Sequence, residues 1–170
     1  MTTPIAAITL HQPYATLIAL GVKPDETRSW PAPRHLTGNL LAIHAGKATG
    51  VLAEARENRA EIALWDDRRR ASFQRRTAIG KFLLHLGEAV PDLDLLPLGA
   101  VVCVARLIQC HRTETIMRTR SEAALVFGDY AYGRYAWALS VVHVFADPIP
   151  AQGKQGIWQW TPPTDFAVKG

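Results

Sequence analysis

The feature that most constrains the fold is residues 99–111, which are apolar at most positions, whichever alternate set is followed. Successive side chains of a β-strand point to opposite faces of a sheet, so this run predicts a long strand that is covered on both faces. Such a strand lies inside a sheet or barrel and not at its edge. The chain is therefore expected to fold around an interior β-strand.

A mixture of short strands and helices is predicted around this strand. Ile79, Phe82, Leu83 and Leu86 follow the i, i+3, i+4, i+7 spacing of an amphipathic helix. Helices are predicted at 13–20, 48–88 and 113–126, and further strands at 5–10, 23–30, 38–44, 135–145 and 157–160. This order favours an α+β fold, a small and strongly bent mixed β-barrel of five to six strands flanked by helices.

The length and composition indicate a single domain over residues 1–170. The chain has 170 residues, 48% of them hydrophobic, which suffices for one full core. A helical, Arg-rich insertion is expected at about 48–96. Its arginines are predicted to form a solvated helix face in preference to a groove-binding surface; they are Arg68, Arg69, Arg70, Arg75 and Arg76.

Charge and cysteine usage narrow the class of protein. The formal net charge of +4 is compatible with attraction to phosphate without requiring it. Cys103 and Cys110 provide no disulfide framework, and neither a secretory signal nor a membrane-length apolar run is recognised. We expect a cytoplasmic protein with no membrane partner.

His and Cys spacings typical of metal sites are lacking, as are nucleotide-binding and acyl-transfer motifs, so no metal and no cofactor are predicted.

Residues 21–30 stand out because they combine strand-forming features with almost no apolar side chains. Strand alternation would place Glu26, Arg28 and Trp30 on one face and Thr27 and Ser29 on the other. A carboxylate, a guanidinium and an indole suit a pocket that holds a polar, planar ligand by charge, forked hydrogen bonds and stacking. The alternative is an edge strand whose Glu26 and Arg28 pair in solvent.

The chain resembles the ASCH (activating signal cointegrator homology) domain, a member of the PUA-like superfamily. The motif G-x-K-x-x-E-x-R is present at Gly21, Lys23, Glu26 and Arg28. Similar segments occur in the family's order before the motif, at 10–15, and after it, at 43–47, 98–102, 135–139 and 153–158. The resemblance implies a β-barrel flanked by helices, with a cleft lined by the motif residues, in a superfamily whose relatives bind RNA or hold a modified base.

The residue chemistry is compatible with a bound base, which requires a planar group to stack on and polar partners at its edge. RNA or a nucleoside is therefore the predicted partner. Trp137, Trp158 and Trp160 are expected in the core, and His44 is either a hydrogen-bonded structural histidine or a site residue. The predicted binding residues are Lys23, Glu26, Arg28, Trp30, Tyr14, His44, Lys47 and Lys154, of which the three lysines are expected to contact phosphate.

An enzymatic function is the alternative. Some small ASCH proteins hydrolyse the amide of N4-acetylcytidine with a lysine, a threonine three residues later and a glutamate from elsewhere. Here Lys23 matches, Glu26 stands at the threonine position, and Thr27 is expected on the opposite strand face. Lys23 and Glu26 would then be the catalytic residues of a metal-independent amidohydrolase, with Glu26 as general base. Ribonuclease action by Lys23 with Tyr14 or His44 is a further alternative that no motif singles out.

Overall fold

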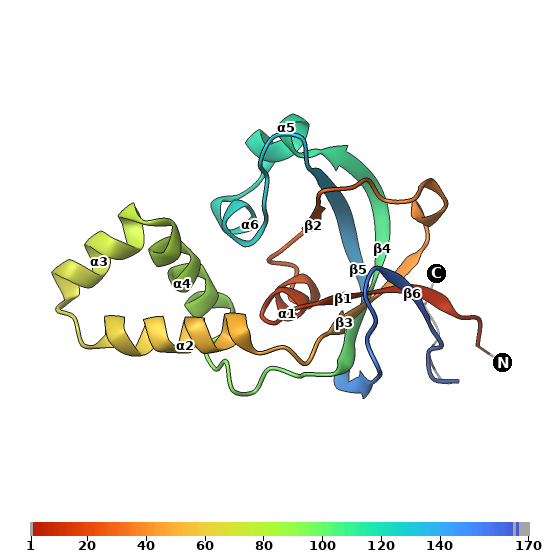
Figure 1. Ribbon diagram of the computed structural model, residues 1–170, viewed down its shortest axis with the longest axis horizontal. Helices are drawn as coiled ribbons and strands as arrows, with labels where there is room; N and C mark the ends of the chain where they lie inside the picture. The colour runs from red at the N-terminus through yellow and green to blue at the C-terminus, as the bar shows by residue number, and fades with distance from the viewer. Residues whose placement is uncertain (1, 165, 167–170) are drawn as a thin grey trace.

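The computed structural model describes residues 2–164 and 166 and shows a mixed six-stranded sheet with helices packed against it (Figure 1). Strands are interspersed with helices along the chain, as the sequence predicted. In chain order the elements are β1 (Ile5–Leu10), α1 (Tyr14–Ala19), β2 (Asp25–Arg28), a 3-10 turn (Arg34–Leu36), β3 (Leu40–Ala45), α2 (Gly50–Ala63), α3 (Asp67–Arg76), α4 (Ala78–Ala89), β4 (Ala100–Arg112), α5 (Thr113–Ile116), a second 3-10 turn (Met117–Thr119), α6 (Glu122–Phe127), β5 (Tyr135–Pro150) and β6 (Ile157–Trp160).

The sheet has the strand order β2-β5-β4-β3-β1-β6. β1 and β3 are parallel, and the other neighbouring strands are antiparallel. β4 and β5 curve strongly around α1 (Figure 1), and the register between them shifts at three places, which bends paired strands. Within the described residues no ladder joins the edge strands β2 and β6, so the α+β class is confirmed but the predicted closure into a barrel is not.

The long strand β4 is covered on both faces over only part of its length. Its residues from Ala100 to Ala105 are all buried, whereas Ile108 is 48% exposed. The difference arises because β3 pairs with β4 only as far as Arg106, and beyond that point β5 is the sole strand recorded beside it. The interior strand was therefore predicted correctly for its first half.

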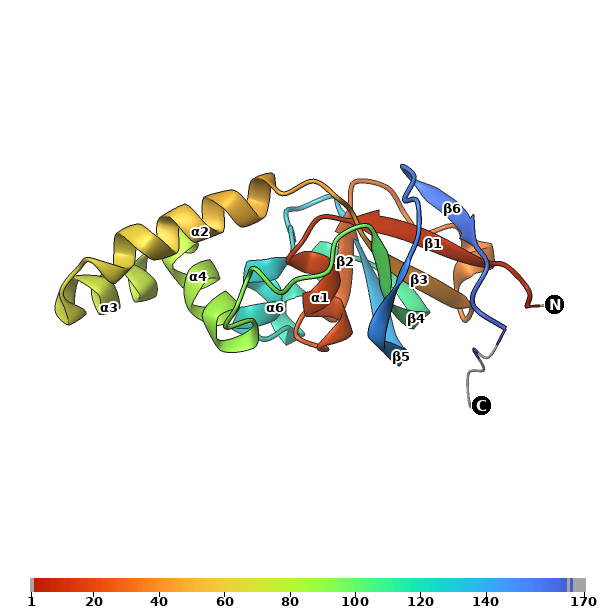
Figure 2. The ribbon, with the colours of Figure 1, turned by 90° about the horizontal axis from the view of Figure 1, so that it is seen from below.

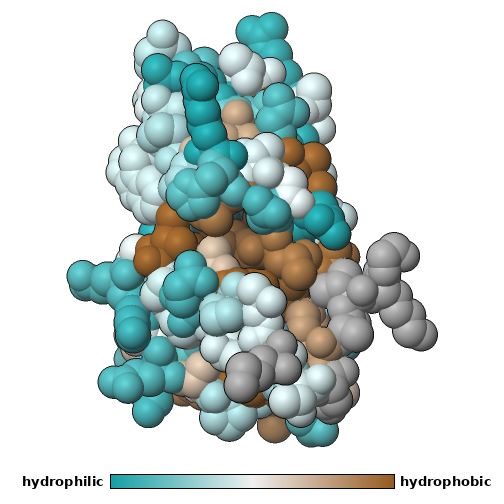
Figure 3. Space-filling view, turned by 90° about the vertical axis from the view of Figure 1, so that its right-hand side faces the viewer, coloured by the Kyte–Doolittle hydropathy of each residue, from teal (hydrophilic) through white to brown (hydrophobic). Residues whose placement is uncertain are grey.

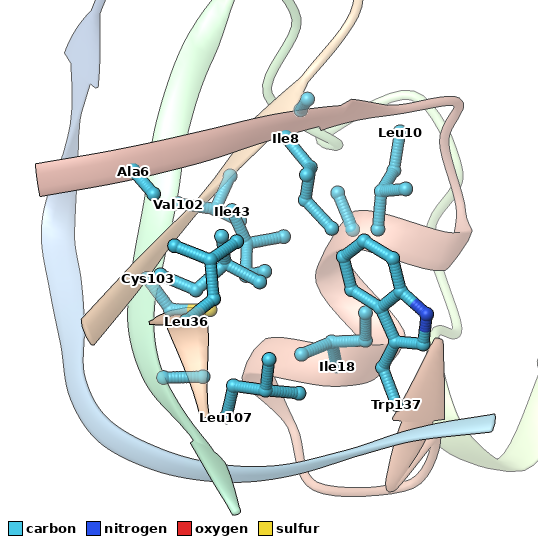
Figure 4. Packing of buried hydrophobic residues seen from close by; sticks show 14 of the residues in the cluster. Ala6, Ile8, Leu10, Ile18, Leu36, Ile43, Val102, Cys103, Leu107 and Trp137 are labelled. Atoms are coloured by element: carbon cyan, nitrogen blue, oxygen red, sulfur yellow. The ribbon is translucent and has the colours of Figure 1, made fainter. Parts of the chain in front are cut away.

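The concave side of the sheet packs on α1 to form the main core. Ile8, Ile18, Ile43, Leu107 and the indole of Trp137 meet there (Figure 4), and each is almost fully buried. A second apolar cluster lies on the other side of the sheet. It contains the predicted core residues Trp158 and Trp160, and Figure 3 shows apolar surface on this side of the molecule.

Helices α2, α3 and α4 together form an arm that extends away from the sheet (Figures 1 and 2). The arm is joined to the rest of the molecule by apolar packing, in which Leu52 of α2 and Leu86 of α4 share a cluster with Leu17 of α1 and Phe127 of α6. Helix α3 has no buried residue and lies at the far end of the arm. Within the described residues, none of the helices combines the length and apolar character needed to cross a bilayer.

Candidate functional site

The site begins where α1 ends. Gly21 adopts φ +73°, a left-handed conformation that favours glycine, and the N–H groups of Val22 and Lys23 then donate to the carbonyl of Leu17 at 3.0 Å. The chain enters β2 at Asp25 and pairs with β5. β2 therefore spans fewer residues than the predicted strand at 23–30, and Lys23 lies in the turn before it.

Glu26 shares its carboxylate between two cations. Lys23 Nζ lies 2.8 Å from Glu26 Oε2, and Arg28 Nε lies 3.0 Å from Oε1. Lys23 also donates to the carbonyl of Asp25 at 2.6 Å. Lys23 is only 3% exposed and Glu26 8% exposed, so the group is not a pair of surface charges in solvent.

A pocket of about 540 Å³ opens beside this group. Its walls include Lys23, Glu26, Arg28, Tyr14 and Trp30, so five of the eight predicted binding residues come together. Trp30 is 36% exposed and rests its ring edge-on against Trp137, with centroids 4.8 Å apart. Burial, together with the nearby negative charges of Glu26 and Glu54, raises the pKa of Tyr14, which keeps its hydroxyl protonated and able to donate.

The expected division of β2 into two faces does not hold at this pocket. Thr27 and Ser29, predicted on the side away from Glu26, line the same pocket. The cause is the loop after α6, which folds over the edge strand: the N–H of Asp129 donates to Thr27 Oγ1 at 2.9 Å. Side chains from both faces of the short strand β2 therefore line the same pocket.

Asp25 is a buried residue of the site region that the sequence reasoning did not single out. It is fully buried, with Arg120 Nη2 at 2.9 Å and the hydroxyl of Tyr130 at 2.7 Å. Burial and the hydrogen bond to Asp25 raise the pKa of Tyr130 well above the usual value, and the hydrogen bonds that Arg120 donates to Asp25 raise the pKa of Arg120. The sequence offered one signal for this, the adjacent acidic residues Asp25 and Glu26 in a predicted strand. Adjacent side chains of a strand point to opposite faces, so when one face is in solvent, one of the two carboxylates points to the other face.

Other residues of the pocket also went unpredicted. Thr9 at the end of β1 and His11 just after it line the pocket, as do Asp129 and Arg134 from the segment between α6 and β5. Arg134 Nε lies 3.1 Å from a carboxylate oxygen of Asp129. These groups come from segments far apart in sequence, so no local motif marks them.

The remaining predicted residues lie elsewhere. His44 and Lys47 line a separate hollow of about 700 Å³, in which Thr9 is the residue shared with the first pocket. His44 Nε2 lies 3.0 Å from the carbonyl of Ala151, and burial lowers the pKa of His44, which favours the neutral ring. Lys154 is exposed and is not among the described residues that line either hollow.

Comparison with known families agrees with this geometry. The model of the ASCH domain matches residues 8–149, which is most of the chain. The chain belongs to the ASCH domain family. The match contains the second half of β1, all of β2, β3 and β4, nearly all of β5 and the whole of the pocket, so the ASCH resemblance drawn from the sequence is confirmed. No curated protein sequence matches the chain.

The chemistry available at the ASCH pocket is that of charge and hydrogen bonding. It offers carboxylate acceptors, guanidinium donors, hydroxyl groups and aromatic rings. Among the described residues, no group of three or more His, Cys, Asp or Glu side chains is placed to hold a metal ion. The pocket can therefore recognise the polar edge and the flat face of one ligand at the same time.

Proposed function

We propose that this ASCH protein binds single-stranded RNA or a modified nucleoside in the pocket lined by Glu26, Arg28 and Trp30. Membership of the ASCH family supports RNA binding or a related function. The observation that carries the proposal is the buried Glu26 carboxylate, held between two cations at the wall of a pocket of about 540 Å³. The strong bend of the sheet supports the PUA-like architecture that the resemblance implies, although no ladder joins its edge strands within the described residues.

Each side chain has a distinct role in this proposal. Glu26 accepts hydrogen bonds from ring or amino N–H groups at the base edge, Arg28 donates to ring or carbonyl acceptors, and Trp30 provides the stacking plane. Lys23 was expected to contact phosphate, but it is 3% exposed and already bonded to Glu26. We therefore assign Lys23 a positioning role: its ammonium group fixes the orientation of the Glu26 carboxylate.

A second candidate is hydrolysis of an acylated base such as N4-acetylcytidine. It is favoured by the close buried contact between Lys23 and Glu26 and by the presence of the Thr27 hydroxyl in the same pocket. In this reaction Glu26 takes a proton from water as the oxygen attacks the acetyl carbonyl. The C–N bond then breaks, acetate leaves, and the proton is returned to the amino group of cytidine.

The two functions are separated by a ligand screen with product analysis. We expect cytidine-type nucleosides or single-stranded RNA to raise the melting temperature by several degrees without turnover, since a ligand at 100 times its dissociation constant adds about 2.7 kcal/mol. RNA affinity should fall as salt rises. The Glu26→Gln variant should lose at least about tenfold in affinity, because a neutral amide replaces the charged acceptor.

Glu57→Gln is the matched control, because Glu57 is exposed on the arm and lines neither the pocket nor the hollow near His44 in the described structure. It should bind like the unaltered protein. Release of acetate from N4-acetylcytidine that disappears in Glu26→Gln would establish the hydrolase instead. If no RNA or nucleoside changes the melting temperature, the pocket does not have the proposed function.

A further inference from the structure

The excess positive charge of the protein is concentrated on one helix. Helix α3 carries five arginines and one acidic residue, Asp67, which is a surplus of four charges over ten residues. The formal net charge of the entire chain is +4. Outside α3 the acidic and basic residues therefore balance, and α3 lies at the far end of the arm (Figures 1 and 2).

Three of these arginines line a hollow that has an aromatic wall. The hollow has a volume of about 530 Å³, and Arg68, Arg69 and Arg76 line it together with Trp65, Phe73 and the acidic Asp66. The guanidinium of Arg69 stacks over the Trp65 ring at 4.0 Å, and the Trp65 and Phe73 rings meet in a T-shaped arrangement with centroids 5.2 Å apart. Both rings also pack against the apolar cluster of the arm, which holds the aromatic wall beside the arginines.

The arginines of α3 differ in whether their guanidinium groups are free to bind a ligand. Arg70 is engaged, because its Nη2 donates to the carbonyl of Trp65 at 2.8 Å. Arg68, Arg75 and Arg76 are exposed, and no ion pair is recorded for them within the described residues. Three exposed guanidinium groups therefore lie on this helix, and those of Arg68 and Arg76 line the hollow beside the Trp65 ring.

A short series of contacts through α4 connects this hollow to the pocket beside Glu26. Phe82 of α4 packs on Tyr14 and Phe127, at 6.4 and 5.5 Å between ring centroids, and both of these rings line the pocket. Thr77, at the edge of the hollow, precedes Phe82 by five residues, an axial rise of about 7.5 Å along a helix. Helix α4 and the ring of Phe82 thus join the hollow to the wall of the pocket.

We propose that the α3 hollow is a second contact site for single-stranded RNA, in which the arginines bind phosphates and Trp65 stacks on a base. This inference rests on the proposed function and deepens it: the natural ligand is an RNA chain several nucleotides long, not a free nucleoside. Unpaired cations beside an aromatic face are the combination that binds single strands, whereas an acidic peptide would gain nothing from the stacking surface.

The test compares two double variants that remove equal charge. Arg68→Gln with Arg76→Gln alters the hollow, and Arg34→Gln with Arg118→Gln removes two exposed arginines that line neither the hollow nor the pocket. Binding of an oligouridine of about 12 nucleotides is measured across a salt series. We expect the hollow variant to lose about tenfold in affinity at low salt, with a salt slope smaller by about 1.4, since each phosphate contact on a single strand contributes about 0.7.

The controls separate this inference from the proposed function. Binding of cytidine should be unchanged in both double variants, and Glu26→Gln should weaken cytidine and oligouridine alike. If RNA binding is lost in the hollow variant but survives Glu26→Gln, the pocket proposal fails and the α3 site stands. Equal RNA affinity and equal salt slope in the two double variants would overturn the α3 site, as would an absence of RNA binding by the unaltered protein or tighter binding of an acidic peptide than of RNA.

Discussion

Lys23 has an ammonium group almost removed from water, with Glu26 and the carbonyl of Asp25 as its partners. Lys23→Met keeps much of the side-chain volume but deletes the charge, and the Glu26 carboxylate then retains only Arg28. We expect the free energy of unfolding to fall by about 2 kcal/mol. The reason is that a hydrogen bond between two charged groups is lost and the buried Glu26 carboxylate keeps one cationic partner instead of two.

Lys154→Met is the matched control for this change, because Lys154 is exposed. Its effect on the free energy of unfolding should stay within about 0.5 kcal/mol. Urea denaturation of both variants measures the difference. If the two variants are equally stable, the buried ion pair makes no net contribution to stability and Lys23 has no structural role.

Tyr130 offers a second test at the level of a single residue, because its hydroxyl donates to the buried carboxylate of Asp25. Tyr130→Phe leaves that carboxylate with Arg120 alone and should cost about 1–2 kcal/mol of unfolding free energy. Tyr132 is 87% exposed, so Tyr132→Phe should cost almost nothing. Equal stability of the two variants would contradict the assigned hydrogen bond.

The stabilising contribution of Tyr130 should depend on pH in the alkaline range. Its pKa is raised in the folded protein by burial and by Asp25, whereas an unfolded tyrosine titrates near pH 10. Above about pH 10 the unfolded state loses this proton while the folded state keeps it, so the stability decreases as the pH rises. The unaltered protein should therefore lose more stability than Tyr130→Phe between about pH 9 and 11, as measured by thermal unfolding at several pH values.

Among the secondary-structure elements, those with a strong local pattern could be predicted from the sequence. The first strand has the predicted bounds, β1 at Ile5–Leu10, and the helical region, the long strand and the final strand lie close to where they were expected. β2 was predicted too long, because residues 23–30 look extended throughout although only Asp25–Arg28 finds a partner strand in β5. Strand length is decided by the neighbouring strand, which a local pattern does not show.

The sequence predicted the part of the candidate site whose residues lie close together in the chain, and not the part that comes from distant segments. Lys23, Glu26, Arg28 and Trp30 were expected together and line one pocket. By contrast, His44 and Lys47 were assigned to the same site but lie at another hollow, and Asp25 was overlooked. Both differences concern contacts between distant segments: the partners of Asp25 are 95 and 105 residues away in sequence, and the carbonyl that His44 contacts is 107 residues away.

The junction of α1 and β2 can be tested through its glycine. Gly21 has φ +73°, and an added Cβ would meet nothing within 4 Å, so the cost of Gly21→Ala is that of the backbone conformation alone. We expect a loss of about 1 kcal/mol in the free energy of unfolding. Gly50, in the first turn of α2, has equal space and no positive φ, so Gly50→Ala should be neutral or slightly stabilising.

Chemical denaturation of the two alanine variants gives this comparison. A Gly21→Ala variant as stable as Gly50→Ala would mean that the chain leaves α1 by a different turn. In that case the placement of Lys23 against Glu26 would also need revision, because Lys23 follows the same turn.

For the molecule as a whole, local stability should decrease from the sheet to the end of the arm. In β3 the residues from Leu41 to Ala45 are all buried, α4 buries Gly80, Leu83 and Leu86 against its neighbours, and α3 buries none. Local opening has a low free energy where few apolar contacts must be broken. Amide hydrogen exchange should therefore be slowest in β3, intermediate in α4 and fastest in α3, and protection of α3 equal to that of β3 would contradict this order.

RNA binding should slow amide exchange in α3 more than elsewhere, because α3 is the proposed second contact site for RNA. A ligand that contacts only the folded form of α3 raises the free energy of its opening by mass action. Saturating oligouridine should thus slow exchange in α3 and around Trp65, whereas saturating cytidine should slow exchange only near β2 and the loop after α6. In the Arg68→Gln, Arg76→Gln variant the first effect should disappear and the second should remain. If cytidine alone protects α3, the arm responds to the base pocket through α4 and does not contact RNA itself.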